Sequence, residues 1–292
     1  MRVGITDSGV GGLSVCAEVE ASLRESPCGQ DLEILYLNAA LQDDYSYNAM
    51  PSRESKLEAF DRFLHNVRNR YRPDILFIAC NSLSVLFKDP FFDSHRNIPI
   101  EGIVEAGTAQ LKRALDTGPD SAFIVFATPT TVEEGTYGHV LAQCGASEKQ
   151  VVEQACPGLP DAISNDFSGA QARELLQHFV PQALSRFETA PAQVQAFLGC
   201  THYGYQSEVF ADLLAAQADE VRVLNPNRAA AAGILEQIEP APGRGKARYR
   251  FITPYAVPEK PLGSLSYYLG ERAPATVAAL QGFELDRRLY GD

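Results

Sequence analysis

The sequence predicts an α/β protein with two similar lobes, each with a mostly parallel sheet flanked by helices. Two observations lead to this prediction. Short apolar runs alternate with longer amphipathic stretches, as expected for successive strand–helix units. Several of these runs are apolar almost throughout, which is typical of strands buried on both faces of a parallel sheet.

The apolar runs predict six strands, at 2–6, 33–37, 74–79, 122–127, 150–155 and 194–199. Apolar residues at helical spacing predict helices over 11–23, 52–70, 168–187 and 225–239. Pro181 is expected to kink or break the third helix, and Asn225 or Asn227 to cap the fourth. A late strand over 248–257 is expected at a sheet edge because it contains Pro254.

The chain also has a coarse internal repeat. Strands ending at Asp7 and Cys80 are separated by nearly the same interval as strands ending near Thr128 and Cys200. Open α/β sheets bind ligands beyond the C-terminal ends of their strands, so an active site is expected in the cleft between two lobes. The predicted first lobe comprises 1–100 plus 208–292, and the second comprises 101–207.

The amino-acid composition argues against several classes of function. The 292 residues are 45% hydrophobic and 21% charged, with a formal net charge of −12, so no nucleic-acid or anionic-membrane partner is expected. No apolar run reaches the roughly 18 residues of a membrane helix, and the N-terminus does not resemble a signal peptide. Six cysteines without CxxC spacing suggest a reducing cytoplasm rather than a disulfide framework.

Two cysteines stand at predicted strand ends beside polar residues, in "FIACNSLS" (77–84) and "FLGCTHYG" (197–204). Cys80 precedes a predicted helix, whose dipole is expected to lower the thiol pKa below its usual value of about 8.5. His202 lies two residues after Cys200. Buried structural cysteines are commoner than reactive ones, but this matched pair indicates a function.

One chemistry that needs two matched thiols is racemisation without a cofactor. One group removes the α-proton of the substrate, and the other supplies a proton to the opposite face. Asp7 and His202 are candidates to tune the thiols, while Asn81, Ser82 and Thr201 could stabilise a substrate carboxylate. The residues do not suggest a metal site, which would need three or four converging ligands.

Three alternatives remain open from the residues alone. A different isomerase or a decarboxylase on the same scaffold could act on another small carboxylate, and a decarboxylase would need one protonating thiol. A non-catalytic protein could use the cleft to bind a carboxylate. A redox protein could form a Cys80–Cys200 disulfide.

The segments "DSGVGGLSV", "ACNS", "ATPTTVEEGTY" and "LGCTHY", in this order and spacing, resemble the glutamate racemases of the aspartate/glutamate racemase superfamily. The resemblance implies cofactor-independent racemisation of a small amino acid or related carboxylate in the cytoplasm, by a homodimer that supplies a D-amino acid for peptidoglycan. It makes Cys80 and Cys200 the paired acid and base, assisted by Asp7 and His202. The substrate-binding residues it implies are Ser8, Asp44, Tyr45, Ser46, Asn81, Ser82, Thr128, Thr131 and Thr201.

The chain departs from this family at several places, of which the exchange of a Thr for Ser82 is mild because it keeps a hydroxyl. Ala39 stands where the family has an Asp, and Asp44-Tyr45-Ser46 stands for its Pro-Tyr-Gly turn. Ser164 stands for a Glu that supports the histidine. Glutamate is the family's default substrate, but a carboxylate at Asp44 would repel the γ-carboxylate of glutamate. We therefore expect Asp44 to steer the pocket towards another amino acid or related acid.

Overall fold

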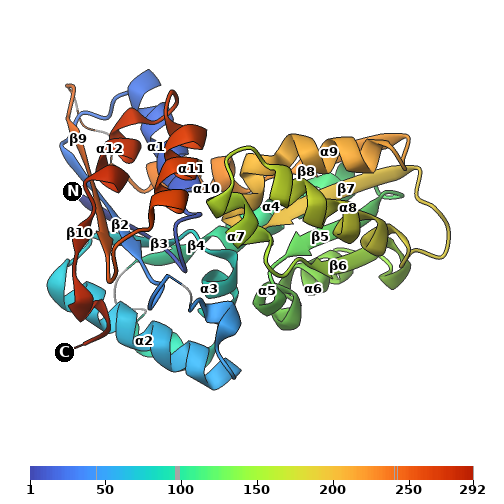
Figure 1. Cartoon of the computed structure of the whole chain (residues 1–292), viewed down its shortest axis with the longest axis horizontal. Helices are drawn as coiled ribbons and strands as arrows, with labels where there is room; N and C mark the ends of the chain where they lie inside the picture. Colours follow the sequence, from blue (N-terminus) through green and yellow to red (C-terminus); the bar gives the residue numbers. More distant parts are fainter. Residues whose placement is uncertain (44, 96–98, 240, 242, 292) are drawn as a thin grey trace.

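The computed structural model describes residues 1–43, 45–95, 99–239, 241 and 243–291, and it has two α/β lobes that lie side by side (Figure 1). The first lobe contains a six-stranded sheet in the order β10-β9-β2-β1-β3-β4, and the second a four-stranded sheet in the order β6-β5-β7-β8. All strand pairs in the two sheets are parallel. The predicted fold class is confirmed.

The strands of the first sheet are β1 (Arg2–Asp7), β2 (Leu32–Asn38), β3 (Ile75–Ile78), β4 (Ile100–Gly102), β9 (Ala247–Thr253) and β10 (Glu284–Leu285). Those of the second sheet are β5 (Ala122–Ala127), β6 (Val151–Ala155), β7 (Gln193–Gly199) and β8 (Glu220–Leu224). The helices packed on the first sheet include α1 (Leu13–Glu25), α2 (Arg53–Arg70), α3 (Asn81–Leu86), α10 (Asn227–Glu236), α11 (Glu259–Leu269) and α12 (Pro274–Gln281). The second lobe contains α4 (Ile103–Thr117), α5 (Pro129–Glu134), α6 (Thr136–Gln143), α7 (Leu159–Asn165), α8 (Ala170–Leu184) and α9 (Ser207–Ala215).

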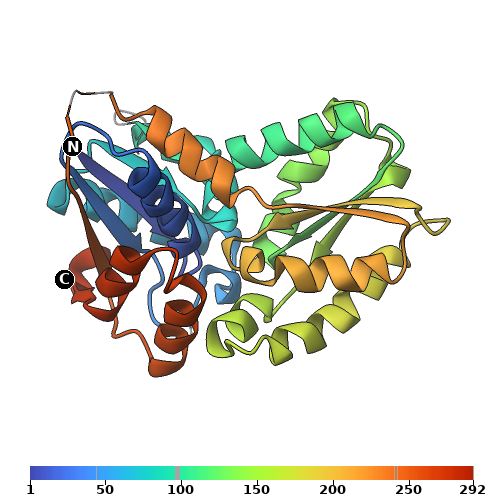
Figure 2. The same ribbon diagram turned by 90° about the horizontal axis from the view of Figure 1, so that it is seen from above.

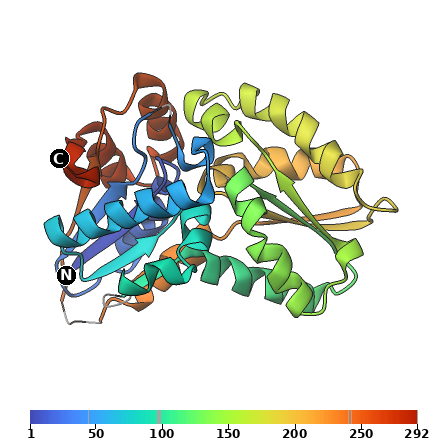
Figure 3. The same cartoon turned by 90° about the horizontal axis from the view of Figure 1, so that it is seen from below.

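Each sheet is buried on both faces because its strands alternate apolar side chains between two cores. In β2, Ile34 and Tyr36 face the core that includes α1, while Leu35 and Leu37 face the core that includes α2. Figure 3 shows α2 running along its face of the first sheet. The second sheet is likewise enclosed by two separate buried clusters. This double burial explains why the central strands are apolar almost throughout.

The chain begins and ends in the first lobe, with the C-terminal helices α11 and α12 beside the first sheet (Figure 2). The predicted boundary assigned 208–292 to this lobe. However, β8 at Glu220–Leu224 pairs with β7 in the second sheet. The lobe boundaries remain a prediction, and we propose that the chain returns to the first lobe after β8.

Two local predictions are corrected, and the cap predicted for the helix over 225–239 is present in part. The late strand β9 is not an edge strand, because it ends at Thr253, before Pro254, and pairs with β2 on one side and β10 on the other. Pro181 does not break α8, which continues to Leu184. The side chain of Asn225 accepts the N–H of Asn227, the first residue of α10, although Pro226, directly before the helix, has no capping side chain.

Within the described ranges, no helix combines the length and the apolar character needed to cross a membrane.

Candidate active site

A cavity of about 610 Å³ lies between the two lobes, at the C-terminal ends of both sheets. Asp7 and Cys80 reach it from the ends of β1 and β3, and Thr128 and Cys200 from the ends of β5 and β7. The strand ends meet here because each lobe is an open parallel sheet whose crossover helices lie on its two faces. The cavity therefore lies where the sequence predicts the cleft.

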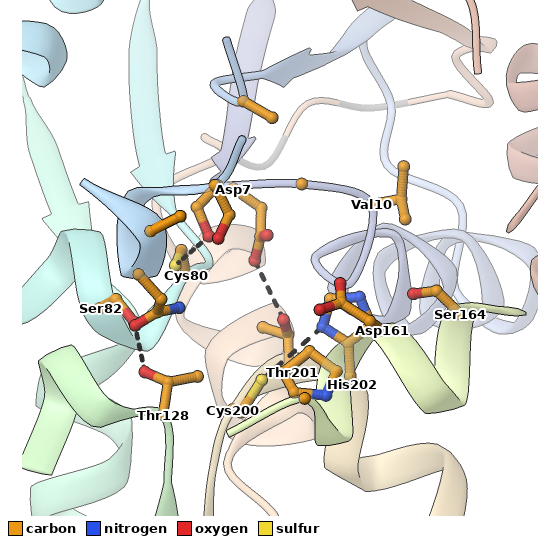
Figure 4. Close-up of a pocket in the computed structure, with 18 of the residues that line it drawn as sticks. Asp7, Val10, Cys80, Ser82, Thr128, Asp161, Ser164, Cys200, Thr201 and His202 are labelled. Atoms are coloured by element: carbon orange, nitrogen blue, oxygen red, sulfur yellow. Dashed lines mark hydrogen bonds between the residues drawn. The ribbon is translucent and has the colours of Figure 1, made fainter. Parts of the chain in front are cut away.

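The two thiols come from different lobes and are both buried (Figure 4). Cys80 precedes α3, and its Sγ lies 3.0 Å from the Oγ of Ser8. Cys200 precedes a 3-10 helix, η4 (Thr201–Gln206), and its Sγ lies 3.7 Å from Nδ1 of His202. All six cysteines are free, so no disulfide joins this pair.

Asp7 connects the two halves of the site. Thr201 Oγ1 donates a hydrogen bond of 3.0 Å to Asp7 Oδ2, from the second lobe to the first (Figure 4). The Asp7 carboxylate also accepts the backbone N–H groups of Gly9 and Gly12 in the turn that leads into α1. The carboxylate is thus fixed between the two thiol-bearing strand ends.

Hydroxyl groups form a second connection between the lobes. Ser82 Oγ lies 2.7 Å from Thr128 Oγ1 and 3.2 Å from Thr131 Oγ1. Beside them, the buried Asn81 accepts a hydrogen bond from Tyr137 at Oδ1. Among the described residues, Asn81 Nδ2 has no hydrogen-bond partner, although Asn81 lines the cavity. A buried amide N–H without an acceptor indicates a ligand acceptor, such as a carboxylate.

The other residues predicted to bind the substrate do not all line the cavity. Ser46 lines the cavity, whereas Tyr45 is half-buried against the core of the first lobe and does not line it. Thr131 is buried behind Ser82 and Thr128. Asp44 lies outside the described residues. The sequence prediction missed several polar residues of the lining, namely Gln42, Asp43, Asn48, Cys156, Asp161, Asn165 and Tyr255.

Within the described part of the chain, no group of three or more His, Cys, Asp or Glu side chains is arranged to hold a metal ion.

Known proteins share this architecture. A glutamate racemase of Aquifex pyrophilus is 28% identical over 204 residues, which is 70% of this chain and 71% of that protein. The crystal structure of glutamate racemase isoform RacE1 from Bacillus anthracis superposes with a TM-score of 0.71 at 20% identity, over 93% of this chain and 95% of that one. A glutamate racemase of Francisella tularensis, solved with D-glutamate, gives a TM-score of 0.70 at 20% identity, over 93% and 94%.

The sequence model described as Asp/Glu/Hydantoin racemase matches residues 3–234, well over half of the chain. The chain belongs to this racemase family. The match confirms the predicted resemblance, and the predicted isomerase class with it.

The thiol pKa values of the racemase differ from the sequence-based prediction. Burial, and then the nearby charge of Asp7, raise the pKa of Cys80 to about 12. Burial also raises the pKa of Cys200 well above its usual value, against a lowering contribution from the His202 backbone N–H. The predicted lowering by a helix dipole was wrong, because α3 has six residues and desolvation of the thiolate is the larger effect.

Burial also shifts the two groups that flank the thiols. Desolvation raises the pKa of Asp7 to about 6, although hydrogen bonds from Thr201, Gly9 and Gly12 oppose the rise. The pKa of His202 falls to about 4 because burial disfavours the imidazolium. At neutral pH the racemase therefore presents an ionised Asp7 and an uncharged His202 to its thiols.

Replacing Gly11 by Ala in the racemase is expected to reduce kcat/KM by about a hundredfold, since small displacements of positioned groups can cost that much. A Cβ built at Gly11 overlaps the imidazole of His202 and the hydroxyl of Thr201, so both side chains must move. Steady-state racemisation assays measure the loss.

Gly233→Ala in α10 is the matched control, because a Cβ there meets no atom within 4 Å. A Gly11→Ala variant as active as the Gly233→Ala variant would show that the positions of His202 and Thr201 do not limit turnover.

Proposed function

We propose that the chain is a cofactor-independent amino-acid racemase in which Cys80 and Cys200 act as the two bases. The observation that carries this proposal is a pair of buried thiols, one from each lobe, that line a single cavity. The glutamate racemases among its relatives support an α-amino acid as the substrate.

The proposed reaction moves one proton off the α-carbon and another onto it. The thiolate of one cysteine takes the α-proton, so that the C–H bond breaks, an S–H bond forms and the electron pair remains on the α-carbon and carboxylate. The thiol of the other cysteine then gives its proton to the opposite face. The two cysteines exchange protonation states, and the enzyme is ready for the other enantiomer.

The surrounding residues have proposed roles in the same reaction. Asn81 Nδ2 donates to the substrate carboxylate, which carries the charge that develops when the α-proton leaves. The hydroxyls of Ser82 and Thr128 line the same cavity as further hydrogen-bonding groups, whereas Thr201 uses its proton to hold Asp7. Ser8 and His202 each contact one thiol and stabilise its two protonation states in turn.

We propose that thiolate forms after the substrate binds. Both thiol pKa values are raised in the protein, and the charge of Asp7 contributes to each rise. The α-ammonium group of an amino acid brings a positive charge beside Asp7, which lowers the pKa of a neighbouring thiol by one to three units in comparable pairs. Substrate binding and thiolate formation are then coupled.

The decisive experiment is proton exchange in D2O. The purified protein is incubated with L- and D-amino acids, including glutamate and aspartate, and the α-proton is followed by NMR. We expect at least one substrate to lose its α-proton signal while both enantiomers accumulate. A decarboxylase would instead release CO2, and a binding protein would leave the α-proton signal of every substrate unchanged.

Two further properties are proposed from the resemblance and the composition. The racemase works as a homodimer, which size-exclusion chromatography with light scattering tests directly. It resides in the cytoplasm, where six free cysteines without CxxC spacing remain reduced. The net charge of −12 supports a small-molecule substrate rather than a nucleic-acid partner.

A further inference from the structure

Among the described residues that line the cavity, the side chains charged at neutral pH are all acidic. Asp7, Asp43 and Asp161 line it, and no lysine or arginine lies among the described residues of the lining. His202, which also lines the cavity, is uncharged at neutral pH because burial lowers its pKa to about 4. Asp7 is bound to Thr201 and belongs to the thiol site. The proposed proton transfer uses neither Asp43 nor Asp161.

Asp43 and Asp161 reach the cavity from opposite lobes. Asp43 follows β2 in the first lobe, and Asp161 lies in the first turn of α7 in the second lobe. Asp161 is open to solvent at the cavity, but the protein around it desolvates the carboxylate and raises its pKa, and the charge of Asp43 raises it further. Because both carboxylates line the same cavity and interact electrostatically, a cation between them would relieve their repulsion.

The opposite side of the cavity is suited to a carboxylate. Asn81 Nδ2 is a buried donor without a partner among the described residues, and the hydroxyls of Ser82 and Thr128 lie beside it. Figure 4 shows Ser82 and Thr128 on one side of the two thiols, and Asp161 with Ser164 on the other. A substrate whose carboxylate binds Asn81 and whose α-carbon lies between the thiols would extend its side chain towards Asp161.

We propose that the substrate is an amino acid with a positively charged side chain, an ammonium or guanidinium group that binds between Asp161 and Asp43. This inference rests on the proposed racemase function and specifies its substrate class. A second carboxylate, as in glutamate, would meet two like charges at the same place. Asp161 and Asp43 are thus the residues that determine specificity, and they leave the proton transfer to the thiols.

The test compares side chains that differ in charge. Proton exchange at the α-carbon is measured in D2O for L-lysine, L-ornithine and L-arginine, for L-norleucine as an uncharged analogue of lysine, and for L-glutamate. We expect kcat/KM for the best cationic substrate to exceed that for norleucine and glutamate at least tenfold. Asp161→Asn and Asp43→Asn should each lower this preference about tenfold.

Asp116→Asn, which changes an exposed aspartate of α4, should leave this preference unchanged. Thermal unfolding of each variant shows that a lost preference does not come from a lost fold. Exchange of glutamate or norleucine as fast as the cationic substrates would overturn the inference and leave the racemase proposal intact. So would an Asp161→Asn variant that slows all substrates equally. Absence of exchange with every amino acid tested would overturn both.

Discussion

Replacing Cys80 or Cys200 by Ser is expected to reduce racemisation about a thousandfold, within the range that a positioned acid or base contributes to a rate. A serine hydroxyl keeps the approximate size of the thiol, but it is a far weaker acid and cannot serve as the base at neutral pH. The rate is followed by polarimetry or circular dichroism, starting from each enantiomer in turn.

Cys144→Ser is the control, because this cysteine is exposed at the end of α6. The two active-site variants also separate the competing mechanisms. Loss of activity in both supports the two-base mechanism, whereas a requirement for one thiol alone favours a decarboxylase. Near-normal racemisation by either variant would exclude the roles proposed for Cys80 and Cys200.

Replacing Asp7 by Asn is expected to reduce activity and to change how the free energy of unfolding depends on pH. Burial raises the pKa of Asp7 from its ordinary value of 3.8 to about 6. Between these values the unfolded chain binds fewer protons than the folded one, so the free energy of unfolding falls as the pH rises. One pKa unit corresponds to about 1.4 kcal/mol. The free energy of unfolding of Asp7→Asn, relative to that of the wild type, should therefore rise by about 2 kcal/mol between pH 4 and pH 7.5.

Urea unfolding at several pH values measures this difference, with the exposed Asp116→Asn as a control whose profile should parallel that of the wild type. Activity should fall about a hundredfold, because Asn cannot supply the negative charge that we expect to bind the α-ammonium group. A stability difference from the wild type that is the same at pH 4 and pH 7.5 would show that Asp7 is not buried as a charged group. Full activity would remove Asp7 from the proposed site.

The fold was predictable from sequence where strands are buried on both faces. The predicted strand over 122–127 coincides with β5, and the one over 2–6 differs from β1 by one residue. The strands β4, β8 and β10 were not predicted from the sequence. β4 and β10 are very short, and β8 is half-exposed at the edge of its sheet, so none has a continuous apolar run.

The site residues that stand at the C-terminal ends of strands were predictable from the sequence. Cys80 and Cys200 each come just after an apolar strand, β3 and β7. In open parallel sheets, residues at the C-terminal ends of strands are accessible to ligands. Asp161 and Tyr255 carry no such signal. Asp161 lies on a short helix, and Tyr255 follows β9, so tertiary packing alone brings them to the cavity. The predicted direction of the thiol pKa shifts was wrong for the same reason, since the burial of the thiols depends on the complete fold.

The two thiols have unlike neighbours, a hydroxyl beside Cys80 and an imidazole beside Cys200. This asymmetry cannot favour one mirror image at equilibrium, because enantiomers have equal free energies in water. The Haldane relation therefore requires equal kcat/KM values for the two directions of a racemase. The unlike neighbours can still change kcat and KM by the same factor. One enantiomer then has a lower KM and a lower kcat than the other. The chirality of the site would then be apparent in saturation behaviour, while the final mixture stays racemic.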